Sequence, residues 1–121
     1  MAVKNYTELI AWQKAMDLAV AVYAATEAYP QREVFGLANQ MRRAAVFIPS
    51  NIAEGQGRAT TKDFVHFLAV SRGSLQELET QAILSHRLQF ISDPTRDGLL
   101  NASLELTRIL HGLINSLSAS V

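Results

Sequence analysis

The sequence predicts an all-α fold: an antiparallel up-down-up-down four-helix bundle, formed by a single domain over residues 1–121. Apolar residues recur three and four positions apart along the whole chain, which is the period of a helix. The composition is 49% hydrophobic but only 7% aromatic, which favours packed helices over a sheet. Turn signals divide the chain into four segments with short linkers, and short linkers make neighbouring helices antiparallel.

The first predicted helix spans residues 7–29. Asn5 and Glu8 have the spacing of a capping box, in which two side chains satisfy free backbone N–H groups at a helix start. Pro30 ends the helix, because proline forces the residue before it out of helical geometry. The predicted buried seam consists of Leu9, Trp12, Met16, Ala19 and Tyr23.

The second predicted helix spans residues 33–54 and contains Pro49. Proline removes one backbone donor and clashes with the carbonyl one turn earlier, so we expect a kink in this helix. Gly55 and Gly57 are expected to form its C-terminal cap and the following turn. The residues predicted to face inward are Leu37, Met41, Ala44 or Ala45, Ile48 and Ile52.

Two further helices are predicted over residues 61–91 and 94–118. Thr60 is the expected N-cap of the first. Asp93 is the expected cap of the second, with Pro94 at the first helical position, where its missing N–H costs nothing. The predicted seam of the third helix is Phe64, Leu68, Ser71, Leu75, Leu78 and Ala82. That of the fourth helix is Leu99, Leu106, Leu110, Leu113 and Leu117.

The residue types narrow the possible chemistry. The chain has no cysteine, which excludes disulfides, thiolate zinc sites and cysteine nucleophiles. Its histidines, His66, His86 and His111, are far apart, and no two share a helical turn. The "GQG" at residues 55–57 follows a helix and lacks the Gly-Lys-Ser/Thr ending of a phosphate loop. We therefore expect no enzymatic activity, no metal and no cofactor.

The hydropathy pattern also bears on location. No apolar run approaches the roughly 20 residues that span a bilayer. The N-terminal sequence "MAVKNYTELI" lacks the basic-then-apolar order of a signal peptide. We expect a cytoplasmic protein that makes no membrane contact.

Charge is balanced overall but unevenly distributed. The chain has 11 basic and 11 acidic residues, yet the segment 36–76 has five basic and two acidic ones, a net charge of +3. Arginine suits bidentate phosphate or carboxylate contacts, so this segment is a candidate nucleic-acid-binding surface. The alternative is that these are ordinary solvated or ion-paired side chains. The candidate residues are Arg42, Arg43, Arg58, Lys62 and Arg72.

A polar stripe lies beside the apolar seam of the second helix. Arg43, Phe47, Asn51, Glu54 and Arg58 are separated by four, four, three and four positions. A buried amide or carboxylate needs hydrogen-bonding partners, and the third helix offers Ser74 and Glu77 beside Gly73, whose missing Cβ leaves room for a neighbour. We interpret Asn51, Glu54, Ser74 and Glu77 as a structural polar network rather than a catalytic one.

Several segments recur in an order that is not generic to helices. They are Trp12 with Lys14 and Ala15, "FGL" at residues 35–37 through "RRA" at 42–44, "PSNIAEG" at 49–55 with Arg58, "FL" at 67–68, and "GSLQELET" at 73–80. Over about residues 6 to 92 the chain resembles the bacterial four-helix bundle family of 23S rRNA intervening-sequence proteins. The last helix is only generically similar.

The resemblance implies an antiparallel four-helix protomer that assembles into a barrel-shaped homopentamer with a central channel. Members of the family generally have no assigned biochemical role. A related branch, the accessory protein of diversity-generating retroelements, works with a reverse transcriptase, is thought to bind nucleic acid and is strongly basic, whereas this chain is neutral. The positions that match the family pattern, without catalytic roles, are Arg42, Arg43, Asn51, Glu54, Gly55, Arg58, Gly73, Ser74 and Glu77.

Two functions follow as expectations. The first is a non-enzymatic oligomer that binds RNA or DNA through its arginines, since five-fold repetition turns a +3 segment into a ring of about fifteen positive charges. The alternative is a scaffold or adaptor whose partner is another protein. Salt dependence separates them, because phosphate contacts release counterions and weaken steeply with salt.

Overall fold

The computed structural model describes residues 5–119 and is all-α over that range. Its four helices are α1 (Ile10–Thr26), α2 (Leu37–Gln56), α3 (Thr61–Arg87) and α4 (Asp93–Ala119). Two short 3-10 helices, η1 (Tyr6–Glu8) and η2 (Gln31–Glu33), precede α1 and α2. The prediction of a four-helix bundle is confirmed. The predicted domain, 1–121, includes end residues that lie outside the described range.

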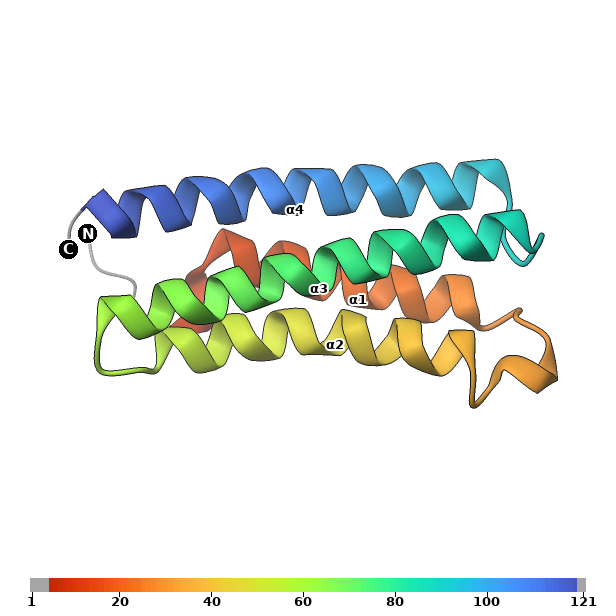
Figure 1. Ribbon diagram of the computed structural model, residues 1–121, viewed down its shortest axis with the longest axis horizontal. Helices are drawn as coiled ribbons and strands as arrows, with labels where there is room; N and C mark the ends of the chain where they lie inside the picture. The colour runs from red at the N-terminus through yellow and green to blue at the C-terminus, as the bar shows by residue number, and fades with distance from the viewer. Residues whose placement is uncertain (1–4, 120–121) are drawn as a thin grey trace.

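Successive helices run antiparallel along the long axis of the molecule (Figure 1). Each helix packs against two others: α1 against α2 and α4, and α3 against α2 and α4. Within the described residues α1 does not pack against α3, and α2 does not pack against α4, so the four helices form a square. Each helix therefore buries one stripe in the centre and leaves its opposite side on the surface.

The seams of α2 and α3 are buried as predicted. Met41, Ala45, Ile48 and Ile52 on α2 are fully buried. On α3, Leu68, Ser71, Leu75, Leu78 and Ala82 are buried, and Phe64 packs partly buried against them. Leu99, Leu106 and Leu110 continue the core on α4, while Leu113 and Leu117 are partly buried.

The predicted seam of the first helix is wrong. Of its five residues only Leu9 and Ala19 are buried, whereas Met16 is 40% and Tyr23 46% exposed. The residues that α1 buries instead are Ala11, Ala15, Leu18, Val22 and Thr26. The physical reason is that α1 is apolar on nearly every side, so the period of its apolar residues does not select one face. Alanines, Leu18 and Val22 take the inward positions, and Met16, Val20 and Tyr23 remain on the surface.

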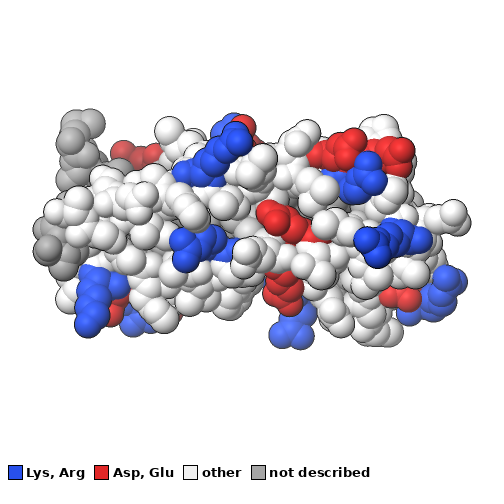
Figure 2. Space-filling model, turned by 45° about the horizontal axis from the view of Figure 1, so that its top comes forward, with Lys and Arg blue, Asp and Glu red and all other residues white. Residues whose placement is uncertain are grey.

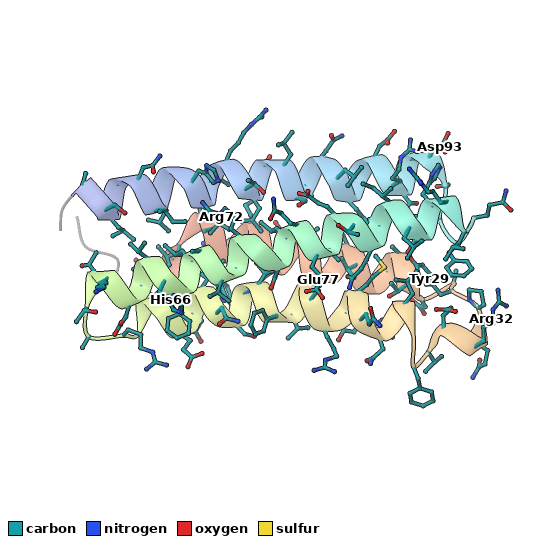
Figure 3. All side chains as sticks on the ribbon, in the orientation of Figure 1. Tyr29, Arg32, His66, Arg72, Glu77 and Asp93 are labelled. Atoms are coloured by element: carbon teal, nitrogen blue, oxygen red, sulfur yellow. The ribbon has the colours of Figure 1, made fainter. Side chains whose placement is uncertain are left out.

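The boundaries of the first helix also differ from the prediction. The side chain of Asn5 accepts a hydrogen bond from the Thr7 N–H at 2.8 Å, so it caps η1 rather than α1. Leu9 is extended, and α1 begins after it. At the other end α1 stops at Thr26, before Tyr29, whose buried ring packs against Phe90 at 5.3 Å between centroids. Figure 3 shows Tyr29 at the end of the bundle where α1 connects to α2.

The second helix begins at Leu37, four residues later than predicted, because Gln31–Glu33 forms the separate turn η2. The Glu33 carboxylate accepts the Leu37 N–H at 2.9 Å, and the Glu33 carbonyl accepts the Gly36 N–H at 3.0 Å. A Cβ on Gly36 would lie 2.8 Å from that carboxylate, so a larger residue there requires the Glu33 side chain to shift. Pro49 is buried inside α2, which continues to Gln56. The predicted kink at Pro49 stays a prediction.

The start of α3 agrees with the prediction, whereas its C-terminal end and the start of α4 differ from it. Thr60 caps α3 as predicted, accepting the Asp63 N–H at 3.1 Å. α3 ends at Arg87, four residues before the predicted limit. The cap of α4 is Ser92, whose hydroxyl accepts the Thr95 N–H at 3.3 Å. Asp93, the predicted cap, instead bonds the His86 ring on α3.

Candidate interaction surface

The predicted polar network between α2 and α3 does not form as expected. Asn51 is buried, but its amide donates to the Phe47 carbonyl of its own helix at 2.7 Å. The Glu54 side chain is 54% exposed and pairs with Arg58 at 2.8 Å, one turn along the chain. Glu77 is exposed as well. Because Ile52 and Gly55 face the core, Glu54 between them points to solvent, and the prediction of a buried Glu54 is wrong.

A polar link between these helices comes from Ser71, a residue that was predicted to lie in the apolar seam of α3. The Ser71 hydroxyl, fully buried on α3, donates to the Ile48 carbonyl on α2 at 3.2 Å. α2 and α3 also approach closely at Gly55, where a Cβ would lie 2.6 Å from the Cβ of Phe67. The close approach predicted at Gly73 is absent, since a Cβ there would meet no atom within 4 Å.

Three of the five candidate cations are held by neighbours on different elements. The Arg42 Nε donates to the Thr26 hydroxyl of α1 at 2.8 Å, and its guanidinium lies 4.8 Å from the centre of the Tyr23 ring. Arg58 pairs with Glu54 and lies 4.8 Å from the centre of the Phe67 ring. The Arg72 guanidinium is 3.3 Å from the His111 ring nitrogen on α4.

The other two cations, Arg43 and Lys62, are exposed and make no hydrogen bond or ion pair with any residue in the range 5–119. The five candidates do not gather into one basic patch, since Arg42 contacts α1 and Arg72 contacts α4. On the face drawn in Figure 2, blue side chains are separated by white and red ones along the length of the molecule.

A groove between α2 and α3 brings together three of the predicted positions, Arg43, Ser74 and Glu77. It has a volume of about 330 Å³ and is completed by Gln40, Ala44 and Phe47. Ser74 is buried, while the two charged residues are exposed. Figure 3 shows Glu77 on the α2 side of α3 and Arg72 on the opposite, α4 side. The groove is therefore polar, with one charge of each sign.

A second groove lies between α1 and α2. We name it the α1–α2 groove; it measures about 540 Å³ and is lined by Tyr23, Asn39, Arg42, Arg43, Val46, Phe47 and Ser50. Tyr23, Val46 and Phe47 are each 44–46% exposed, which is high for apolar side chains of this size. On α1 the exposed apolar surface continues through Met16 and Val20, the latter 68% exposed. These five apolar residues, together with the groove, make up what we call the α1–α2 face.

No histidine lines either groove. Within residues 5–119 no three acidic or histidine side chains gather in a way that could hold a metal ion. None of the described helices is both long and apolar enough to span a membrane. What the two grooves offer is shape, exposed aromatic and aliphatic surface, and guanidinium groups.

Three groups with shifted pKa values lie away from both grooves. The His86 ring, and more weakly Arg96, lowers the pKa of the Asp93 carboxyl. The hydrogen bond and charge of Glu105 raise the pKa of Lys14. Burial raises the pKa of the Tyr29 hydroxyl. All three belong to contacts between elements of the bundle, so they bear on its stability and not on the grooves.

Comparison with known proteins identifies the family of this chain. Residues 7–112 match the model of the family described as 23S rRNA-intervening sequence protein. The chain belongs to this family. The matched range contains the first three helices, most of α4 and the residues that line both grooves. No curated protein matches the chain.

A solved structure shares the fold of this chain. It is a crystal structure, at 1.70 Å resolution, of a protein of unknown function from the S23 ribosomal protein family of Bacteroides thetaiotaomicron. The two chains are 22% identical, the likeness covers 88% of this chain and 96% of that one, and the TM-score is 0.79. At this identity the likeness shows that the two chains share a fold.

Proposed function

We propose that this member of the 23S rRNA-intervening sequence protein family is a non-enzymatic scaffold, which binds protein surfaces through its α1–α2 face and first of all binds its own copies. The observation that carries the proposal is the group of exposed apolar residues on that face: Met16, Val20, Tyr23, Val46 and Phe47. Single exposed apolar residues are ordinary, but a contiguous group marks an interaction site.

The composition of the α1–α2 face is that of an interface. Aromatic residues, methionine and arginine are enriched where proteins meet, and lysine and glutamate are depleted. The α1–α2 groove contains two aromatic rings and two arginines, and no acidic residue or lysine lines it. α1 in addition presents apolar side chains on two sides, one inside the bundle and one on the surface. A helix of that kind is expected to be covered on both sides.

For the assembly itself we propose a homopentamer, which is the state that the family resemblance implies. The test is size-exclusion chromatography with light scattering, where five copies of the 13.3 kDa chain are expected to elute together. Val20→Glu places a charge on the α1–α2 face and is expected to lower the mass. Ile83→Glu, at an exposed apolar residue of α3, is the matched control. A wild-type monomer at tens of micromolar would contradict the proposal.

Nucleic-acid binding is the second candidate function. It is favoured by Arg58 and Lys62, both exposed, which flank the turn that leads into the N-terminus of α3. Helix N-termini and arginines both suit phosphate. Non-specific binding of this kind has dissociation constants of about 10⁻⁴ to 10⁻⁶ M at physiological salt.

The experiment for the second candidate is a mobility-shift titration of labelled RNA and DNA at two salt concentrations. If phosphate contacts contribute, binding is detectable at low salt and weakens steeply as salt rises. Arg58→Gln and Lys62→Gln are then expected to weaken it, while Arg32→Gln, an exposed arginine at the other end of the bundle (Figure 3), is the control. The absence of any shift at low salt with tens of micromolar protein contradicts nucleic-acid binding and leaves the protein scaffold.

A further inference from the structure

The connection between α1 and α2 displays the most exposed large apolar side chain among residues 5–119. Phe35 is 93% exposed, and Val34 beside it is 48% exposed. A phenylalanine that makes almost no contact within its own chain contributes little to folding and exposes a large apolar surface to water. Such a side chain is well placed to contribute to an interface.

This connection is an ordered structure rather than a loose loop. Val34 N–H donates to the Gln31 carbonyl at 3.2 Å, and Glu33 accepts two bonds, from Gly36 and Leu37, at 3.0 and 2.9 Å. Two hydrogen bonds to Glu33 thus fix the backbone on the α2 side of Phe35. Because this backbone is already ordered, little backbone entropy is lost when Phe35 binds, which favours its use as an anchor.

The α1–α2 groove has the lining that an aromatic side chain prefers. Tyr23, Val46 and Phe47 supply apolar and aromatic walls, and Arg42 and Arg43 supply guanidinium groups. Arginine binds favourably over the face of an aromatic ring. Arg42 already lies over Tyr23, whereas Arg43 has no hydrogen-bonding or ionic partner within the described residues. One arginine is therefore available to cover an incoming ring.

The charges of the two surfaces are complementary within this one sequence. The segment 27–36 that carries Phe35 contains Glu27, Arg32 and Glu33, a net charge of −1. It also follows the C-terminal end of α1, where the helix dipole is negative. The α1–α2 groove contains two arginines and no carboxylate, a net charge of +2. A second copy of the chain thus supplies the ring and the opposite charge together.

We propose that Phe35 of one copy inserts into the α1–α2 groove of the next copy. The inference rests on the proposed self-assembly and specifies its geometry. Phe35 does not occupy its own groove, since it is 93% exposed. The contact joins two different surfaces, so it is heterologous and propagates from copy to copy until a ring closes.

The absence of cysteine from the chain makes the contact testable by disulfide trapping. In Phe35→Cys/Val46→Cys a disulfide within one chain is excluded. The nine residues from Leu37 to Val46 alone span about 14 Å of helix, whereas disulfides need Cα atoms within about 7 Å. Loss of the ring weakens the contact, but a disulfide is covalent and accumulates from brief encounters, so mild oxidation is expected to give a ladder of linked chains that collapses on reduction. The matched control is Phe35→Cys/Ala102→Cys, whose second cysteine is exposed on α4.

The single variants decide the arrangement. Phe35→Cys alone and Val46→Cys alone are each expected to stay unlinked, because a heterologous contact brings neither residue to its own copy. If two copies of the single variant Phe35→Cys link to each other as efficiently as the double variant links, the proposal is overturned, because that result shows a two-fold contact. The proposal is also overturned if Phe35→Cys/Val46→Cys gives no more linked chains than Phe35→Cys/Ala102→Cys does.

Truncation gives a second, independent measurement. Phe35→Ala is expected to shift the light-scattering mass toward the monomer at unchanged helix content, since Phe35 packs against almost nothing in its own chain. Leu104→Ala, at a 47% exposed residue of α4, is expected to keep the wild-type mass. If the wild type is itself a monomer, the proposed function fails; if the wild type and Phe35→Ala assemble equally, only the insertion of Phe35 is overturned.

Discussion

The hydroxyl of Ser71 on α3 donates a hydrogen bond to the carbonyl of Ile48 on α2, 3.2 Å away in the fully buried centre of the bundle. The bond crosses between helices at the residue that precedes Pro49 in the chain. The Ser85 hydroxyl on α3 also reaches α2, through the Met41 sulfur at 3.4 Å, whereas the Ser71 bond is made to the backbone of α2. The Ser71 bond therefore fixes the position of α3 along α2.

Removal of this bond is expected to destabilise the bundle. Ser71→Ala takes away a buried donor, and a typical intramolecular hydrogen bond contributes about 0.5–1.5 kcal/mol. Urea unfolding should show a free energy of unfolding lower by roughly that amount. Ser118→Ala, at an exposed serine near the end of α4, is the control and should stay within about 0.5 kcal/mol of wild type. Equal midpoints for the two variants would contradict the role assigned to Ser71.

The two glycines Gly55 and Gly73 predict opposite effects of the same substitution. Gly55→Ala places a Cβ 2.6 Å from the Cβ of Phe67 and 3.1 Å from a ring carbon of Phe64. Overpacking of this kind costs typically about 1–3 kcal/mol. Gly73→Ala meets no atom within 4 Å in the middle of α3, so it should raise stability by roughly 0.5–1 kcal/mol through helix propensity. Thermal unfolding of both variants measures the difference, and a stable Gly55→Ala would refute the close approach of α2 and α3.

Replacement of Glu54 is expected to have little effect. The side chain is 54% exposed, and its pair with Arg58 is an exposed contact one helical turn apart. Such pairs contribute about 0.3–0.5 kcal/mol and are screened by salt. Glu54→Ala should therefore change the free energy of unfolding by no more than about 0.5 kcal/mol. A loss of several times that value would restore the buried network that the sequence suggested.

How much of the fold the sequence predicts depends on how one-sided each helix is. On α2, Ile48 and Ile52 alternate with exposed Phe47 and Glu54, so spacing alone identifies the buried side. On α1 the outward Val20 is as apolar as the inward Val22, and only the neighbouring helices decide which one is buried. Capping residues and prolines predict that a turn exists, but they predict less well at which residue a helix begins or ends.

The candidate site was less predictable than the fold. The prediction of one basic surface depended on cations that are close along the chain: Arg42, Arg43, Arg58, Lys62 and Arg72. Their partners belong to other elements: Arg42 contacts α1 and Arg72 contacts α4. No local pattern indicates which cations a bundle will pair. The exposure of Phe35 was not predicted, because the predicted helix over residues 33–54 included this residue. Phe35 is exposed because a turn replaces the start of that helix.

The α3–α4 connection contains a contact that involves a carboxyl with a lowered pKa. His86 on α3 bonds the Asp93 carboxylate at the start of α4, and an Arg96 nitrogen lies 3.1 Å from the other ring nitrogen of His86. The His86 contact is the main cause that lowers the pKa of Asp93, with Arg96 adding to it. A carboxyl whose pKa is lower in the folded state than in the unfolded state stabilises the fold only while it is ionised.

Replacement of Asp93 should therefore have a pH-dependent effect. Unfolded aspartate has a pKa of about 3.9, so the contribution of Asp93 is fully present above that pH and is lost as pH falls through its lower folded pKa. Asp93→Asn is expected to lower the unfolding midpoint at pH 6 and 5, with the difference from wild type shrinking toward pH 3. Glu27→Gln, at an exposed carboxylate without an ion pair within residues 5–119, should show no such trend. A wild-type advantage that persists unchanged at pH 3 would mean that Asp93 acts through something other than its charge.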